Sequence, residues 1–110
     1  MKFLGIARDV VNSLKIGLTS ISTVITGIGR IGVNITPASV AAATSAPQTF
    51  TVPGAQVGDA VFVTPPAVNP GVAPVTARVS AADTVSISFM NATAGALVPS
   101  AGVYQFLLIR

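Results

Sequence analysis

The last third of the chain carries its clearest alternation of hydrophobic and polar residues. Val85, Ile87 and Phe89 alternate with serines, which is the period of a strand with one buried face and one wet face. The run at residues 103–110 is almost continuously apolar, as expected of a strand that is central in a sheet or covered on both faces. The pattern therefore predicts strands at 85–91 and 103–110, joined by a loop rich in alanine, glycine and proline.

Shorter alternating segments upstream predict the partners of these two strands, at residues 48–52, 60–64 and 75–80. Turn-forming residues separate them: Pro53-Gly54, Val57-Gly58-Asp59, Pro65-Pro66 and Ala81-Ala82-Asp83. Five or six strands with no helical pattern between them predict a mainly β protein, a small antiparallel β-sandwich or barrel. The expected core residues are Val52, Val61, Val63, Val79, Val85, Ile87, Phe89, Leu107 and Ile109.

The first part of the chain follows a helical pattern instead. Apolar residues recur at alternating spacings of three and four, the heptad rule of packed helices, at Leu4, Ala7, Val11, Leu14, Leu18, Ile21, Ile25 and Ile28. Further apolar residues widen this face, glycines lower its helix propensity, and the β-branched segment 19–25 suits a strand equally well. We expect an N-terminal arm, residues 1–40, with a helix at about 3–18, then an extended segment that includes a strand from residue 28 to Ile35. The β domain then occupies residues 41–110, after a boundary in the small-residue stretch 38–46.

An isolated helix of this length is marginal in water and needs partner copies or a docking surface. The candidate residues for oligomerisation or docking lie on the seam and its continuation: Leu4, Val11, Leu14, Leu18, Ile21 and Ile25. Only 8% of the 110 residues are charged, against 51% hydrophobic. A monomer with so few charges is prone to associate, and this indicates an assembly subunit.

The distribution of charged residues argues against nucleic-acid binding, membrane insertion and export. The net charge of +3 comes from scattered basic residues, whereas a nucleic-acid footprint groups them on one face. The charge-free run at 16–29 is shorter than the roughly 20 residues that span a bilayer, and Arg8 and Asp9 interrupt the apolar core that a signal peptide requires. We therefore expect neither nucleic-acid binding, nor membrane insertion, nor export.

The sequence offers little for catalysis. It contains no cysteine and no histidine, which removes thiol nucleophiles, histidine bases and the commonest metal ligands. Asp59 and Asp83 occupy turns, where aspartate caps backbone amides. Arg78 is expected either to pair with one of them or to face solvent. The glycines of Gly27-Ile28-Gly29-Arg30-Ile31-Gly32 miss the dinucleotide-binding spacing. We expect no enzyme activity, no metal and no cofactor.

From residue 36 onward the chain contains a series of turn and strand-end motifs: Val52-Pro53-Gly54, Val57-Gly58-Asp59, Pro65-Pro66, the segment 78–84, the strand end at Asn91 and Thr93, and Tyr104 in the last strand. In these motifs, residues 36–110 resemble a small β-module family of tailed-bacteriophage and prophage virion proteins. The resemblance implies a structural protein of the virion and no catalytic residues. The arm is not part of it.

The expected function is thus a non-enzymatic capsid decoration or cement protein, made in the host cytoplasm, that oligomerises as a trimer and docks on the major capsid protein or other virion proteins. Three copies are favoured by analogy with the local symmetry of icosahedral shells. The alternative is a tail or head fibre component with a receptor- or glycan-binding β module, in which Tyr104, Phe106 and loop prolines offer contact surface.

Overall fold

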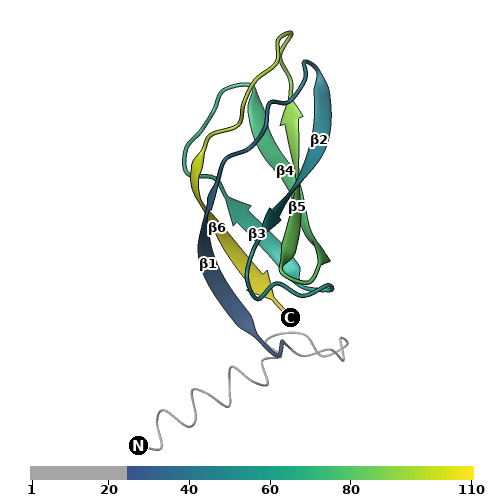
Figure 1. The fold of residues 1–110 in the computed structure, drawn as a ribbon, viewed down its shortest axis with the longest axis vertical. Helices are drawn as coiled ribbons and strands as arrows, with labels where there is room; N and C mark the ends of the chain where they lie inside the picture. Colours follow the sequence, from purple (N-terminus) through teal and green to yellow (C-terminus); the bar gives the residue numbers. More distant parts are fainter. Residues whose placement is uncertain (1–24) are drawn as a thin grey trace, which may run out of the picture.

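The computed structural model describes residues 25–110, which form two three-stranded antiparallel sheets packed face to face (Figure 1). The strands are β1 (Ile28–Ile35), β2 (Thr44–Thr51), β3 (Ala60–Thr64), β4 (Val72–Ala81), β5 (Thr84–Asn91) and β6 (Gly102–Ile109). The prediction of a mainly β, small antiparallel sandwich of five to six strands is confirmed. The predicted helix at 3–18 lies outside the described residues.

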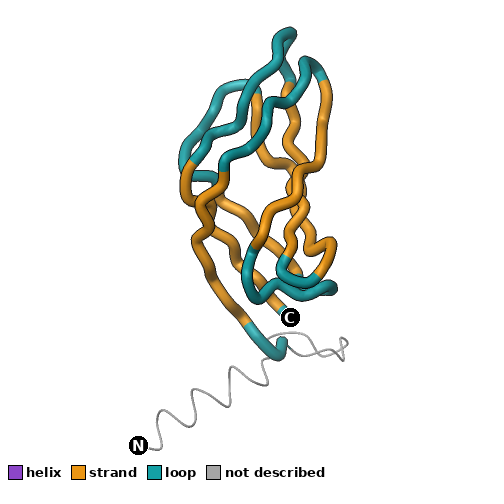
Figure 2. The backbone as a smooth tube through the Cα atoms, viewed as in Figure 1, coloured by secondary structure: helices purple, strands orange, loops and turns teal. Residues whose placement is uncertain are grey.

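Each sheet is built around one of the two strands that the sequence pattern identified most clearly. β6 lies between β1 and β3 in one sheet, and β5 lies between β2 and β4 in the other. β4 and β5 form a hairpin, while every other connection crosses between the sheets, so the loops gather at the two ends of the sandwich (Figure 2). Of the two alternatives given for the last strand, a central position in a sheet is the one that the structure shows.

Both edge strands of the second sheet are longer than predicted. β2 begins at Thr44 rather than at residue 48, and β4 begins at Val72 rather than at residue 75. Each contains a proline, Pro47 or Pro74. Proline is tolerated here because an edge strand leaves one row of backbone N–H groups unpaired.

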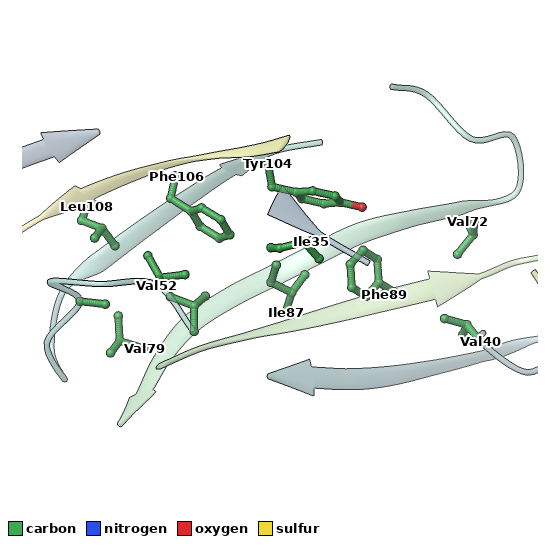
Figure 3. Close-up of a cluster of buried hydrophobic side chains, with 12 residues drawn as sticks. Ile35, Val40, Val52, Val72, Val79, Ile87, Phe89, Tyr104, Phe106 and Leu108 are labelled. Carbon is green, nitrogen blue, oxygen red and sulfur yellow. The ribbon is translucent and has the colours of Figure 1, made fainter. Parts of the chain in front are cut away.

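The core lies between the sheets and is dominated by β5 and β6 (Figure 3). Phe89 is fully buried, and its ring meets Phe50 and Tyr104 edge-on, each with ring centroids 6.4 Å apart. The buried hydrophobic residues are Ile35, Val40, Val52, Ala55, Val72, Val79, Val85, Ile87, Phe89, Tyr104, Phe106 and Leu108. Val61 and Val63 of β3 are partly buried against this cluster.

The predicted inward face of β6 is wrong. Tyr104, Phe106 and Leu108 point into the core, whereas Leu107 and Ile109 lie on the outer face and are only half-buried. A shift of one residue exchanges the two faces of a strand, and a continuously apolar run does not reveal its own phase. Gln105, which shares a face with Leu107, is the residue that marks the outward side.

The structure also makes residues 28–43 part of the sandwich, contrary to the prediction of a β domain that begins at residue 41. β1 pairs with β6 along its whole length, from Ile28 opposite Ile109 to Ile35 opposite Gly102. The small-residue stretch is no linker either. Val40 is 1% exposed and exchanges two backbone hydrogen bonds with Leu97, at 2.8 and 3.1 Å.

Candidate functional site

The carboxylates of the β domain are structural, as predicted. The Gly54 N–H donates to Asp83 Oδ1 at 2.8 Å, and the Gln56 N–H donates to Asp59 Oδ2 at 3.0 Å. Asp83 itself has a φ of 57°, in the left-handed region that aspartate tolerates in tight turns. Both side chains therefore hold the turns at one end of the sandwich. Asp9 lies outside the described residues.

Arg110, not Arg78, is the ion-pair partner of Asp59. The Arg110 Nη2 lies 2.7 Å from Asp59 Oδ2 and also donates to the Gly54 carbonyl at 2.8 Å. The Asp59 side chain is only 2% exposed, so this pair ties the end of β6 to the turn before β3. Arg78 is exposed on β4. Within residues 25–110, no group of three or more acidic, cysteine or histidine side chains lies where it could hold a metal ion.

The aromatic contact surface expected for a receptor-binding module is not formed by Tyr104 and Phe106. Both side chains are 0% exposed and belong to the core. The Tyr104 hydroxyl donates to the Ser100 carbonyl at 2.7 Å, which satisfies the one polar group of the ring. The exposed aromatic residue of the first sheet is instead Phe62 of β3, which is 60% exposed.

Burial raises the pKa of the Tyr104 phenol, because desolvation disfavours the phenolate. The chain has one tyrosine and no tryptophan, so phenolate absorbance in the ultraviolet reports this group alone. We expect a titration midpoint above the value of about 10 that the unfolded chain shows. The protonated phenol's contribution to stability is fully present below about pH 10 and is lost as the pH rises through the folded-state pKa. Equal midpoints for folded and denaturant-unfolded chain would contradict this.

Asn91 organises the loops at the other end of the sandwich. It is 1% exposed, and its Nδ2 donates to the carbonyls of Val40 at 3.0 Å and Gly95 at 2.8 Å. Its Oδ1 accepts from the Thr93 N–H at 2.9 Å and from the Thr93 hydroxyl at 2.7 Å. All four hydrogen-bonding positions of the amide are thus used. They join the end of β5 to the loop that follows it and to the loop around Val40, which is distant in sequence.

Replacing Asn91 with alanine is expected to lower the free energy of unfolding by about 2–3 kcal/mol, because four hydrogen bonds of a buried amide are lost together and each contributes roughly 0.5–1.5 kcal/mol. Asn69→Ala is the matched control. The Asn69 amide makes one bond, to the Val98 carbonyl at 2.6 Å, and is less buried, so its loss should cost about 1 kcal/mol. Urea unfolding of the full chain measures both. Equal losses in the two variants would refute the special role of Asn91.

The outer face of the second sheet is rich in hydroxyl groups. Ser86 of β5 lies opposite Thr49 of β2 and Arg78 of β4, and Ser88 lies opposite Pro47 and Thr76. Because Val85, Ile87 and Phe89 point inward, these serines point away from the core. Hydroxyl groups hydrogen-bond readily to water, so this face suits exposure to solvent.

The outer face of the first sheet has the opposite character. Ile28 lies opposite Ile109, and Leu107 lies between Arg30 on β1 and Phe62 on β3. Five side chains define what we call the apolar outer face: Ile28, Phe62, Val103, Leu107 and Ile109. Three of them remain 49–60% exposed, although an antiparallel sheet with a free outer face commonly places polar residues there.

A shallow hollow of about 420 Å³ lies on the apolar outer face. Phe62, Leu107 and Arg30 line it together with Thr64 and Gln105. Arg30 supplies a single charge at the β1 side and no carboxylate stands beside it among the lining residues. A broad, open and mostly apolar hollow without reactive groups suits contact with another protein surface better than chemistry on a small molecule.

The arm residues predicted to carry oligomerisation are not brought together by the described structure. Leu4, Val11, Leu14, Leu18 and Ile21 lie outside residues 25–110. Ile25 is half-buried where the described chain begins. The next residues, Thr26 and Gly27, donate backbone hydrogen bonds to the Arg110 carbonyl at 2.6 and 2.9 Å. The chain therefore enters the sandwich beside Ile28 and Ile109, at one end of the apolar outer face.

Comparison of the chain with protein-family models, with curated proteins and with solved structures finds no match. Among residues 25–110 there is no helix with the length and apolar character needed to span a membrane. The apolar outer face was not predicted from the sequence.

Proposed function

We propose that the chain is a non-enzymatic structural protein of a bacteriophage virion, a capsid decoration or cement subunit that oligomerises and docks on the capsid shell. The observation that carries the proposal is the contrast between the two outer faces of the sandwich. One is rich in serine and threonine, and the other exposes Ile28, Phe62 and Val103. A module with one face suited to water and one suited to protein is what a subunit of a larger assembly requires.

Composition supports the same proposal. With 8% charged residues and 51% hydrophobic residues, the chain lacks the charge that keeps monomers apart at high concentration. The resemblance of residues 36–110 to virion β modules supports a virion as the assembly to which the chain belongs. The expected partners are further copies of this chain and the major capsid protein or other virion proteins, and three copies remain favoured by analogy with shell symmetry.

The alternative, a fibre component that binds a receptor or glycan, loses its principal support. Its contact surface was expected to include Tyr104 and Phe106, and both are buried. Sugar-binding sites typically stack a sugar ring on exposed aromatic side chains. On the outer faces of the two sheets, Phe62 is the one exposed aromatic residue.

Quantitative mass spectrometry of purified phage particles tests the proposal. We expect this chain in the particle at a copy number comparable with that of the major capsid protein, on the order of hundreds, as the symmetry of a shell requires. A handful of copies per particle would favour the fibre alternative. Absence from washed particles would overturn the virion proposal.

A further inference from the structure

We propose that the apolar outer face is covered by residues 3–18 of a second copy of this chain, folded as a helix that lies along β6. The proposal rests on the proposed function, since it names the surface through which the oligomer forms. It differs from a bundle of arms alone, because the partner of each arm is a sheet.

The dimensions of the face favour a helix as its occupant. β1 and β6 have eight residues each and β3 has five. With strands about 4.8 Å apart and a rise of about 3.3 Å per residue, the face is about 26 Å long and up to about 15 Å wide, or at most about 400 Å². This is half of the roughly 800 Å² that each partner of a stable globular complex buries. A helix of 16 residues is about 24 Å long and about 10 Å wide, so it matches both the length of β6 and the width of the sheet.

The apolar pattern of the arm is also the pattern of a helix that packs on a sheet. At about 100° per residue, seven apolar side chains of segment 3–18 fall within a stripe about 120° wide: Phe3, Leu4, Ala7, Val10, Val11, Leu14 and Leu18. A strict coiled-coil seam is narrower. The charged residues of the segment, Arg8, Asp9 and Lys15, lie off the stripe, as required against a face whose single charge is Arg30 at its edge.

The connection to the sandwich favours a second copy over the chain's own face. The chain enters beside Arg110, at one end of the apolar outer face. To lie on its own sheet the helix would have to reverse direction within residues 19–24. Residues 18–26 contain no glycine, proline, asparagine or aspartate, so Ser20 and Ser22 are the only turn-favouring residues of this segment. Six of its nine residues are β-branched, which favours an extended backbone. Six extended residues carry the helix about 20 Å beyond its own sheet, within reach of a neighbour.

Cysteine cross-linking in the full chain tests the contact, because the natural sequence has no cysteine. Leu14→Cys and Phe62→Cys are made in separate, differently tagged chains, co-expressed, and treated with a short bis-maleimide. Phe62 is 60% exposed, so the change leaves the core intact. The control replaces Phe62→Cys with Met90→Cys, which is 49% exposed on the hydroxyl-rich face.

We expect a covalent dimer whose cross-linked peptide joins position 14 of one chain to position 62 of the other, at a yield at least about tenfold above the Met90 control, because docking raises the local concentration of the two thiols. Cross-links only between two positions 14 would overturn the proposal in favour of an arm bundle. Cross-links only between two positions 62 would replace it with direct contact of two faces.

A chain that carries both Leu14→Cys and Phe62→Cys tests the remaining possibility, that the arm covers the apolar outer face of its own chain. A cross-link that forms within one chain, at monomer mobility, and that is absent between chains would show that the arm folds back on its own sheet and would also overturn the proposal. The outcome is separable from the virion assignment. If the chain forms an oligomer in particles but shows no cross-link between positions 14 and 62, only this inference is wrong. If the cross-linked dimer forms but the chain is absent from particles, only the proposed function is wrong.

Discussion

Replacing Phe89 with alanine is expected to lower the free energy of unfolding of the full chain by about 3–5 kcal/mol. Phe89 is fully buried at the centre of β5 and packs edge-on against Phe50 and Tyr104, with ring centroids 6.4 Å away in each case. Alanine would lose the transfer energy of the ring and both aromatic contacts, and would leave a cavity between the sheets. Such a loss is a large share of the 5–15 kcal/mol typical of a small domain.

Met90→Ala is the matched control for Phe89→Ala. Met90 is the next residue of the same strand, but it points outward and is 49% exposed, so its truncation should change stability by less than about 1 kcal/mol. Chemical denaturation of both variants measures the difference in the free energy of unfolding, provided that the dependence of this free energy on denaturant concentration is the same in both. A Phe89→Ala variant as stable as Met90→Ala would mean that the described core is wrong.

How far the sequence predicted the sandwich depended on how regular each strand is. β5 alternates cleanly, and its inward residues Val85, Ile87 and Phe89 were identified correctly. For β6 a central position was one of two alternatives, and its faces were exchanged, because Leu107 and Leu108 are equally apolar and only Gln105 distinguishes the two sides. Local pattern fixes a strand's phase only where a polar residue interrupts it.

The place of β1 was not predictable from local pattern, for a different reason. Pairing of Ile28 with Ile109 joins the two ends of the described chain, and such contacts leave no mark on nearby sequence. The burial of Val40 was hidden in the same way, since its neighbours are small and its partner, Leu97, lies far along the chain. The predicted boundary between residues 40 and 41 was based on composition, whereas the extent of the sandwich is determined by which segments pair through backbone hydrogen bonds.

The candidate site was only partly accessible to sequence reasoning. Turn capping by Asp59 and Asp83 followed from residue type and was confirmed. The four hydrogen bonds of Asn91 were missed, because the carbonyls it reaches belong to residues distant or irregular in structure. The apolar outer face was missed because it comes into view only once β1, β6 and β3 are aligned in register. The arm residues remain a prediction.

The second large effect is expected from Leu14→Asp. Leu14 lies at the middle of the apolar stripe of segment 3–18, whether that stripe meets another arm or the apolar outer face. A carboxylate there would have to be buried in each contact, at a cost of several kcal/mol. That cost raises the dissociation constant of the oligomer by at least about 100-fold, so the variant should be a folded monomer. Lys15→Asp, one residue away and off the stripe, is the control and should leave the oligomer intact.

Light scattering coupled to size exclusion, on the full chain beside Leu14→Asp and Lys15→Asp, tests most directly the claim that this is a self-assembling subunit that associates through its arm. We expect the mass of a trimer for the natural chain and Lys15→Asp, and the mass of a monomer for Leu14→Asp, with the thermal unfolding of the sandwich retained. A Leu14→Asp chain that keeps the full oligomeric mass, or a natural chain that is monomeric at every concentration, would contradict it.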